Sequence, residues 1–321
     1  MSADPLSDAL AVADARCVFS GGFTAGGDWS VRLRGRDKLK INAVVRGSCL
    51  LVPEDGGEVL RIEAGDVVVT DGRRTYVLCS DPALEPVAAA DVVVDPGSRM
   101  ARLGEGDEFV AVSGHIDLSR DSGDLLRAAL PPLVRLRATA TEAPVLGWLV
   151  GQILAEMTTG RPGADFAGDQ LAQLVLVQVL RVCLDGAPDL PAGWLRGLGD
   201  DGIAPALRLM HAEPGRAWQL RELAGAAAMS RTTFALRFKA AVGVPPLTYL
   251  LNWRMGLAAR ALREGGTPVS VLARQVGYAS ESAFSNAFKR ATGVAPRRYR
   301  DTVRADADDA DVAHGEAAIA R

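Results

Sequence analysis

The apolar positions of this chain follow two different periods, which divide it near residue 131. From Trp29 to Val94, short apolar runs such as INAVV (41–45) and TYVLCS (75–80) alternate with clusters of Gly, Pro and Asp. That spacing is typical of hairpins in a small antiparallel barrel or sandwich. Beyond this point the apolar residues recur at helical intervals, over 145–157 and again over 168–184. The pattern therefore predicts a β-rich domain followed by helices.

We divide the chain into four parts and predict an α+β fold. Residues 1–130 form the β-rich domain, and residues 131–201 form a helical linker. Both linker helices are apolar over a broad face, so they need a partner surface, either in the β-rich domain or in a second protomer of a homodimer. Residues 202–300 form an all-helical domain, entered through a stretch rich in Gly, Pro and Asp. The acidic, Ala-rich tail 301–321 is predicted to be disordered.

The helical domain contains one sequence pattern twice. Residues 229–250 (MSRTTFALRFKAAVGVPPLTYL) and 279–300 (ASESAFSNAFKRATGVAPRRYR) are identical at nine positions with an offset of 50 residues. Random matching of such segments would give about one or two identities, so the match indicates an internal duplication.

Each copy has the residues of a capped helix that follows a tight turn. Ser230 and Ser280 are suited to cap the start of the helix, two Phe residues four positions apart face inward, and a Gly ends it. A shorter helix is predicted upstream of each copy, over 221–229 and over 270–278. A short helix, a turn and a second helix make a helix-turn-helix, whose second helix enters the DNA major groove.

Between the two copies, residues 246–265 have apolar positions at helical spacing and predict one continuous helix. About 19 residues at roughly 1.5 Å each span about 28 Å, which is close to the roughly 34 Å between successive major grooves on one face of DNA. We therefore expect one chain to read two adjacent groove segments.

The helical domain is also the basic part of an acidic protein. Residues 202–300 carry 15 Lys and Arg against 4 Asp and Glu, whereas the whole chain has a formal net charge of −3. Charge concentrated in this way indicates a polyanionic partner such as double-stranded DNA. A cytoplasmic protein without a membrane partner is expected, because no apolar run is long enough for a span and the start lacks the features of a signal peptide.

Residues 203–300 resemble the DNA-binding domain of the AraC/XylS family of bacterial regulators. The similarity is densest over 276–300 (VGYASESAFSNAFKRATGVAPRRYR), which contains the family's Gly-Tyr before the second recognition helix and its closing Pro-x-x-Tyr-Arg. The resemblance implies a two-lobed domain of seven helices that recruits or blocks RNA polymerase at promoters.

Base reading is expected from the outer face of each recognition helix, because the Phe residues occupy the inner face. Arg231 can contact guanine or phosphate, Asn286 can pair with adenine, and Glu281 can accept a hydrogen bond from cytosine. The family often has Arg where this chain has Leu236 and Asn286, and Arg237 is a partial substitute beside the first of these. The full set of candidates is Arg231, Thr232, Ala235, Leu236, Arg237, Glu281, Ser282, Ser285 and Asn286.

Phosphate contacts, which position the protein without reading sequence, are expected from basic residues later in each copy. Solvated surface charge is the alternative explanation for each of them. These candidates are Lys239, Lys289, Arg290, Arg297 and Arg298.

The strands of the N-terminal part resemble the cupin-like barrel of one AraC-type subgroup. The similarity rests on Gly47 in a turn, on Asp66 before a strand and on the Asp-Gly pair before Tyr76. The resemblance implies an antiparallel β-barrel that senses a signal. Metal-binding cupins have histidines where this chain has Asn42 and Tyr76, so neither a metal nor a cofactor is expected. These two residues are instead candidates for the lining of an effector pocket.

We expect a transcription regulator rather than an enzyme, and two hypotheses for its signal stay open. In the first, the barrel binds a small apolar molecule and shifts the DNA-binding domains. In the second, Cys17, Cys49 or Cys79 responds to oxidants, which requires an exposed thiol of low pKa. A cupin-type enzyme fused to a DNA-binding module is the alternative from another class. The missing metal ligands argue against it.

Overall fold

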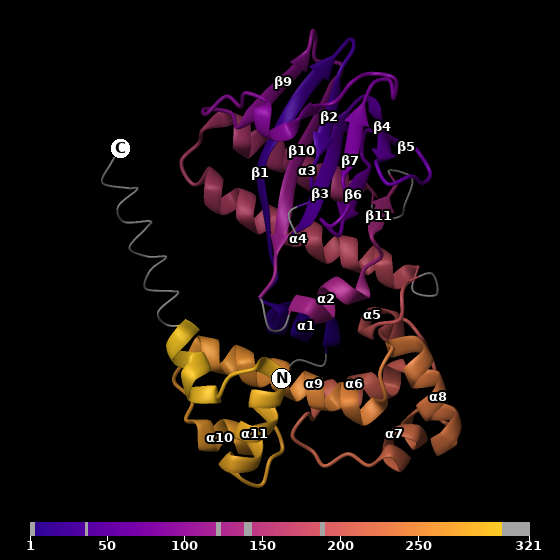
Figure 1. Ribbon diagram of the computed structural model, residues 1–321, viewed down its shortest axis with the longest axis vertical. Helices are drawn as coiled ribbons and strands as arrows, with labels where there is room; N and C mark the ends of the chain where they lie inside the picture. The colour runs from indigo at the N-terminus through magenta and orange to yellow at the C-terminus, as the bar shows by residue number, and fades with distance from the viewer. Residues whose placement is uncertain (1–3, 36–37, 120–122, 138–142, 187–189, 304–321) are drawn as a thin grey trace. The chain divides into compact units, whose positions relative to one another are not determined.

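The computed structural model describes residues 4–35, 38–119, 123–137, 143–186 and 190–303. The chain divides into two compact units (Figure 1). The strand unit comprises Ala15–Leu118 and Arg127–Pro191, and the helical unit comprises Met1–Asp14, Ser119–Leu126 and Ala192–Arg321. The predicted tail 301–321 lies outside the described residues from position 304 onward.

Two β-sheets form the framework of the strand unit, with strand orders β11-β6-β3-β10-β1-β9 and β5-β4-β7-β2-β8. The first sheet consists of β1 (Arg16–Gly26), β3 (Leu39–Arg46), β6 (Val67–Thr70), β9 (Met100–Gly104), β10 (Phe109–Asp117) and β11 (Leu133–Leu136). The second sheet consists of β2 (Ser30–Leu33), β4 (Ser48–Pro53), β5 (Leu60–Glu63), β7 (Tyr76–Cys79) and β8 (Val87–Ala88).

Side chains from both sheets meet in one apolar core, as a two-layer domain requires. At its centre the rings of Phe23, Trp29 and Phe109 lie with centroids 5.0 to 5.5 Å apart. Leu51 and Leu78 of the second sheet belong to the same cluster. This core joins the two sheets into one body.

The strand pairing differs from the expected antiparallel barrel at two edges. Most pairs are antiparallel, but β9 runs parallel to β1 and β8 runs parallel to β2. Parallel neighbours need a long connection, so the turn residues beside each strand carry no signal for such a pairing. The result is a pair of facing sheets with two parallel edge strands.

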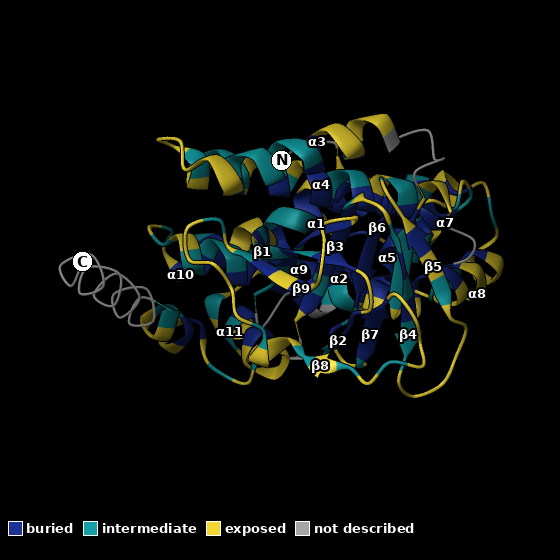
Figure 2. Cartoon of the chain, turned by 90° about the horizontal axis from the view of Figure 1, so that it is seen from above, coloured by how far each residue is buried: buried dark blue, intermediate teal, exposed yellow. Residues whose placement is uncertain are grey.

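The linker helices α3 (Ala143–Thr159) and α4 (Ala164–Asp185) pack against each other and against the first sheet. By length and composition alone α4 could cross a membrane; 33% of its apolar window is buried, including Val175, Leu176 and Val179, and the helix contacts β1. Of the two partner surfaces considered for these helices, their own β-rich domain thus covers one face. Exposed stretches remain on both helices (Figure 2).

Eight helices follow Ala192 among the described residues, and the seven that lie beyond residue 202 match the number that the family resemblance implies. They are α5 (Trp194–Leu198), α6 (Ala204–Ala212), α7 (Leu220–Ala226), α8 (Arg231–Val242), α9 (Pro246–Glu264), α10 (Val269–Gln275), α11 (Glu281–Thr292) and a helical segment over 296–303. Helix α9 lies between the pair α7/α8 and the pair α10/α11 (Figure 1).

Two segments from the first half of the chain also belong to the helical unit, and the sequence pattern did not predict this. Helix α1 (Pro5–Ala13) begins at the cap Asp4, whose side chain accepts a hydrogen bond from Leu6 N at 3.1 Å. It packs on α6 and α9. The start of α2 (Gly123–Ala129) belongs to the same unit, up to Leu126. An Asp-Pro start with apolar residues at helical spacing was the available signal for α1.

Candidate nucleic-acid interface

The two sequence copies fold into the same local structure. Ser230 Oγ accepts from Thr233 N, and Ser280 Oγ accepts from Ala283 N, each at 3.2 Å. At the other end, Gly243 and Gly293 adopt φ of 88° and 83° and donate to the carbonyl four residues back at 2.8 Å. Both recognition helices, α8 and α11, are therefore twelve-residue helices with equivalent caps.

A set of three aromatic rings in tilted and edge-to-face contact holds each recognition helix. In the first copy the centroids of Phe234 and Phe238 lie 5.5 Å apart, and Tyr249 meets Phe238 at 5.8 Å. In the second copy, Phe284 and Phe288 lie 5.7 Å apart, and Tyr299 meets Phe288 at 5.4 Å. All four Phe side chains have no exposed surface. The inward position assigned to them from the sequence is confirmed.

The turns before the two recognition helices differ by one residue. Met229 N donates to Ala224 O, and Tyr278 N donates to Ala273 O, so these pairs are equivalent with an offset of 49. The capping serines have an offset of 50, because the second copy carries the extra residue Ala279. The left-handed position in the first turn is Ala228 (φ 51°), where the second turn has a Gly.

The base-reading candidates lie along α8 and α11. None of them is buried: Ala235, Ser285 and Glu281 are half-buried, and the others are exposed. The largest apolar side chain among them, Leu236, is 67% exposed. A leucine held in water in this way is available to contact another surface, such as the methyl group of thymine.

Two of these candidates are engaged in ion pairs within the protein. Arg237 donates to both carboxylate oxygens of Asp200, at 2.8 and 3.2 Å, so it braces the segment before α6. Glu281 forms an ion pair with Arg297 at 3.3 Å, so one of the phosphate candidates is also engaged within the protein. The proposed substitution of Arg237 for a missing Arg at Leu236 would therefore require a bidentate pair to break.

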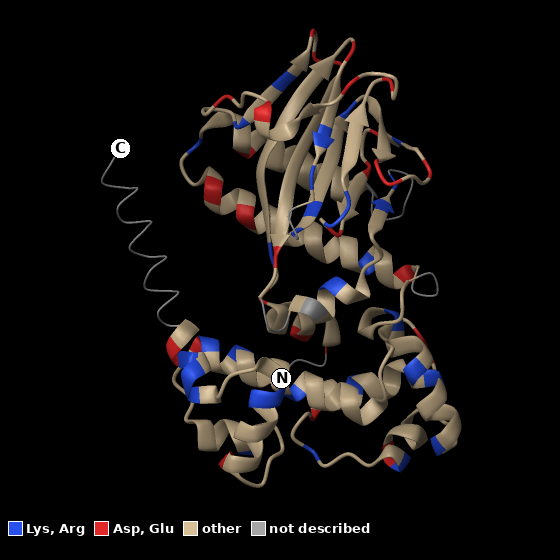
Figure 3. Cartoon of the chain, in the orientation of Figure 1, with Lys and Arg blue, Asp and Glu red and all other residues tan. Residues whose placement is uncertain are grey.

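The remaining phosphate candidates are free cations. Lys239, Lys289, Arg290 and Arg298 are exposed and make no ion pair among the described residues. Figure 3 shows the Lys and Arg residues of the unit. Three of these four lie in the last turns of α8 and α11, where they also favour the helix C-termini.

Further exposed arginines in the unit were not among the sequence candidates. They are Arg208 on α6, Arg221 on α7 and Arg274 on α10. Arg221 and Arg274 lie on the first helix of each helix-turn-helix, at positions that are not equivalent in the duplication.

Beside α11 the surface is hollowed. Tyr278, Asn286, Lys289 and Arg290 line this open depression. The depression thus brings one base-reading candidate and two phosphate candidates together.

His211 lies buried beneath the first helix-turn-helix, as a packing residue. Its Nε2 lies 2.7 Å from the hydroxyl of Tyr249, and its ring stacks on Trp253 with centroids 4.0 Å apart. Its Nδ1 has no hydrogen-bond partner among the described residues. Burial lowers the pKa of His211 to about 4, so the imidazole is neutral at physiological pH.

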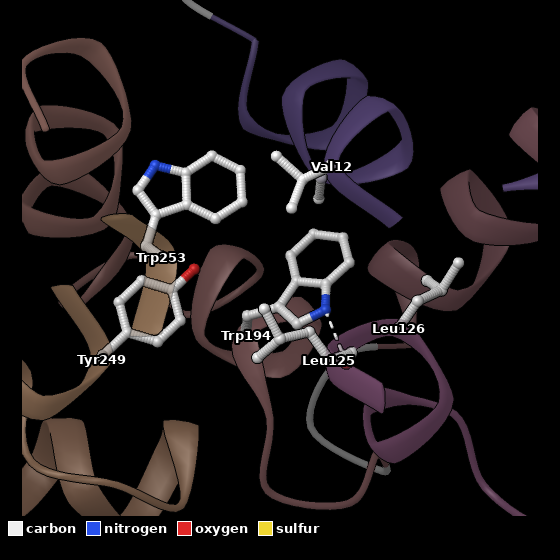
Figure 4. A pocket seen from close by; sticks show the side chains of 7 residues that line it. Val12, Leu125, Leu126, Trp194, Tyr249 and Trp253 are labelled. Carbon is white, nitrogen blue, oxygen red and sulfur yellow. Dashed lines mark hydrogen bonds between the residues drawn. The ribbon is translucent and has the colours of Figure 1, made fainter. Parts of the chain in front are cut away.

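The N-terminal helix is joined closely to α9 within the helical unit. A Cβ added to Gly256 would lie only 2.8 Å from Val12 Cγ1, so the Gly permits the close approach of α1. Arg263 donates to Val12 O at 2.9 Å. Beside this contact Trp194 donates to Leu125 O at 3.0 Å, and Figure 4 shows Val12, Trp194 and Trp253 among the residues that line a small pocket there.

The strand unit holds a cavity of about 440 Å³ that both proposed effector-pocket residues line. Asn42 and Tyr76 are 7% and 4% exposed, and Asn42 Oδ1 accepts from Ser113 Oγ at 2.8 Å. Among the described residues no group of three His, Cys, Asp or Glu is placed to hold a metal ion.

The cysteines do not have the properties that a redox sensor requires. Cys17, Cys49 and Cys79 are all buried, and burial raises the pKa of Cys17 to about 12. Burial likewise raises the pKa of Cys49 and of Cys79. A thiol of high pKa that water does not reach is a poor nucleophile.

Family models match both parts of the chain. A cupin model matches residues 4–185, and a helix-turn-helix domain model matches residues 223–302. An AraC-like transcription regulator of Streptomyces antibioticus is 40% identical over 297 residues, which cover 92% of this chain and 98% of that protein. The regulator AlkR of Acinetobacter baylyi is 30% identical, over 85% of this chain and 91% of its own length.

Two solved structures are also similar. The DNA-binding domain of AdpA, in complex with a target DNA, is 31% identical over 33% of this chain and 96% of its own, with a TM-score of 0.32. ToxT of Vibrio cholerae is 14% identical over 90% of this chain and 97% of its own, with a TM-score of 0.35.

The buried His211 predicts that acid destabilises the helical unit. Unfolded His211 binds a proton near pH 6.5, whereas the folded residue binds one only near pH 4, so the free energy of unfolding falls as pH drops through that window. The difference amounts to about 3 kcal/mol. Urea unfolding followed by Trp fluorescence at several pH values measures it. The fall in unfolding free energy with decreasing pH is expected to be smaller in His211→Gln and unchanged in the control His115→Gln. An equal fall in both variants would contradict the assignment.

Proposed function

This chain belongs to the AraC-like transcription regulators with an N-terminal cupin domain, and from that premise we propose how it reads DNA and what governs it. It is a DNA-binding transcription regulator. We propose that one chain reads two consecutive major-groove segments. The principal support for this proposal is that α8 and α11 have equivalent caps, equivalent buried aromatic rings and exposed outer faces.

Within these helices we assign base reading first to Arg231 and Asn286. Both are exposed and neither forms an ion pair among the described residues. Leu236 contributes an apolar contact, while Arg237 stays with Asp200 as a structural residue. The DNA phosphates are bound by Lys239, Lys289, Arg290 and Arg298. Arg297 also binds a phosphate when Glu281 leaves the ion pair and accepts a hydrogen bond from a base.

Substitutions at α11 are expected to separate reading from phosphate binding. Asn286→Ala lowers affinity for a site selected from random sequences by about 1–3 kcal/mol, roughly 5- to 150-fold, and leaves binding to random DNA unchanged. Lys289→Ala weakens both alike and reduces the salt slope by about 0.9. Anisotropy titrations over a salt series measure both effects, with Arg102→Ala on the strand unit as control. Equal losses on the two DNAs for Asn286→Ala would remove its reading role.

We propose that the cavity of the strand unit receives a small-molecule signal and that α1 carries it to the DNA-binding helices. Strands β1 and β10 contribute Ser20, Ser113 and Gly114 to the cavity lining. The chain reaches β1 directly from α1, and it leaves β10 at Ser119, whose N–H donates to Ala13 O at 2.8 Å. A change in the spacing of these two strands thus acts on the segments that touch α9.

Gly256→Ala is expected to loosen α1 without unfolding α9, because Ala favours the helix while its Cβ displaces Val12. Hydrogen exchange of the α1 amides should rise, and affinity for the selected DNA site should change with it. Gly225→Ala in α7 is the matched control, since no atom lies within 4 Å of the added Cβ. Faster exchange in α1 together with unchanged DNA affinity would contradict the proposed route.

The regulator is proposed to act as a homodimer in the bacterial cytoplasm, with the outer face of α3 and α4 as the contact. Four large apolar side chains are exposed there, of which Phe166 is 74% exposed and Trp148 is 60% exposed; the others are Val145 and Leu174. Their spacing along each helix places them on one face. Contact of the DNA-bound dimer with RNA polymerase then sets transcription, and in vitro transcription with purified polymerase measures its direction.

Trp148→Ser combined with Phe166→Ser is expected to convert the dimer to a monomer, because the change removes most of the exposed apolar surface of these helices. Light scattering after size exclusion gives the mass directly. The control is Leu247→Ser, a similarly exposed leucine on α9. A monomeric wild-type protein, or a double variant that stays dimeric, would show that this face is not the interface.

A further inference from the structure

The cavity of the strand unit is lined by an excess of cations. Arg32, Arg34, Lys40 and Arg74 contribute to its wall. Asp91, on the short helix η1 (Ala89–Asp91), is the one carboxylate among the described residues of the lining, and it is exposed. Such a wall differs from the apolar interior that the sequence led us to expect.

Arg32 and Arg74 are neutralised within the protein. Arg32 forms an ion pair with Glu54, and Arg74 forms one with Asp55 at 3.4 Å. Arg34 has no such partner among the described residues and is exposed toward solvent. A guanidinium in this position has its full set of donors available for a ligand.

Two buried polar side chains of the lining also present donors. Asn42 uses its Oδ1 to accept from Ser113, which leaves its Nδ2 amide group without a partner among the described residues. The Tyr76 hydroxyl likewise has no hydrogen-bond partner among them. Neither atom is among the buried polar atoms without a partner, so both donors are accessible and available to an acceptor-bearing ligand or to water.

The lining also has an apolar portion, which includes Leu33, Leu51 and Ala88 to Ala90. We propose that the cavity binds a small organic anion, whose carboxylate or phosphate contacts Arg34, Lys40 and the Asn42 amide while its apolar body lies on Leu51. The cavity volume of about 440 Å³ is in the range of small-molecule sites. This inference rests on the proposed function and names the ligand class of its sensing site.

Matched compounds test the charge requirement on the full-length protein. The probes are 4-phenylbutanoate, its phosphate analogue 3-phenylpropyl phosphate and the neutral 4-phenylbutanamide, titrated by calorimetry. One or both anions are expected to bind at least about tenfold more tightly than the amide, because a charge-assisted hydrogen bond to Arg is about twice as strong as a neutral one. The two anions distinguish a carboxylate ligand from a phosphate ligand.

Variants of the lining test the location. Arg34→Gln and Asn42→Ala are expected to reduce anion affinity by about fivefold or more, whereas Arg102→Gln, at an exposed arginine of β9 outside the lining, retains it. The inference is overturned if the amide binds as tightly as the anions, if none of the three probes binds, or if Arg102→Gln loses as much affinity as Arg34→Gln.

A DNA titration separates this inference from the proposed function. The same preparations are assayed for preference between the selected site and random DNA. If the protein prefers the selected site but neither anion binds, only the proposed ligand class is wrong. If the protein shows no preference for the selected site, the proposed reading of DNA is wrong, whatever the cavity binds.

Discussion

The burial of two phenylalanines beneath each recognition helix is the constraint on which the interface depends. The Phe234–Phe238 and Phe284–Phe288 pairs are fully buried, and Tyr249 or Tyr299 closes on the second ring of each. Residues four apart lie on one helix face, so anchoring that face turns the opposite one outward whatever side chains it carries. The side chains at the proposed reading positions Leu236 and Asn286 can therefore vary without altering the fold that presents them.

The basic charge of the helical unit overstates how many residues are available to DNA. Arg254 donates to the carbonyls of Pro214 and Arg216, and Arg263 donates to the Tyr299 hydroxyl and to Val12 O. Arg237 is held by Asp200. Such arginines join loops to helices through their fixed fork of donors. Exposed cations without an ion pair among the described residues include Lys239 on α8 and Lys289 and Arg290 on α11, the two helices proposed to read DNA.

The helical unit contains chain segments from both ends of the β-rich region. Helix α1 precedes β1, and the segment from Ser119 follows β10, so the two paired strands Arg16–Gly26 and Phe109–Asp117 are tethered to the helical unit at neighbouring ends. The same strands contribute to the cavity wall. A regulator needs a physical link between the site that senses and the site that reads, and this connectivity supplies a covalent one.

Local patterns in the sequence by themselves determined the duplicated helix-turn-helix, its caps and its buried Phe residues, because each signal involves residues within about one or two helical turns. They also showed most strands of the N-terminal part. Only the tertiary structure decided the parallel edge strands, the docking of α1 against Gly256, the pairing of Arg237 with Asp200 and the cationic wall of the cavity. Each of these depends on groups far apart in the chain, such as Val12 with Gly256 or Arg32 with Glu54, and no local period records such a contact.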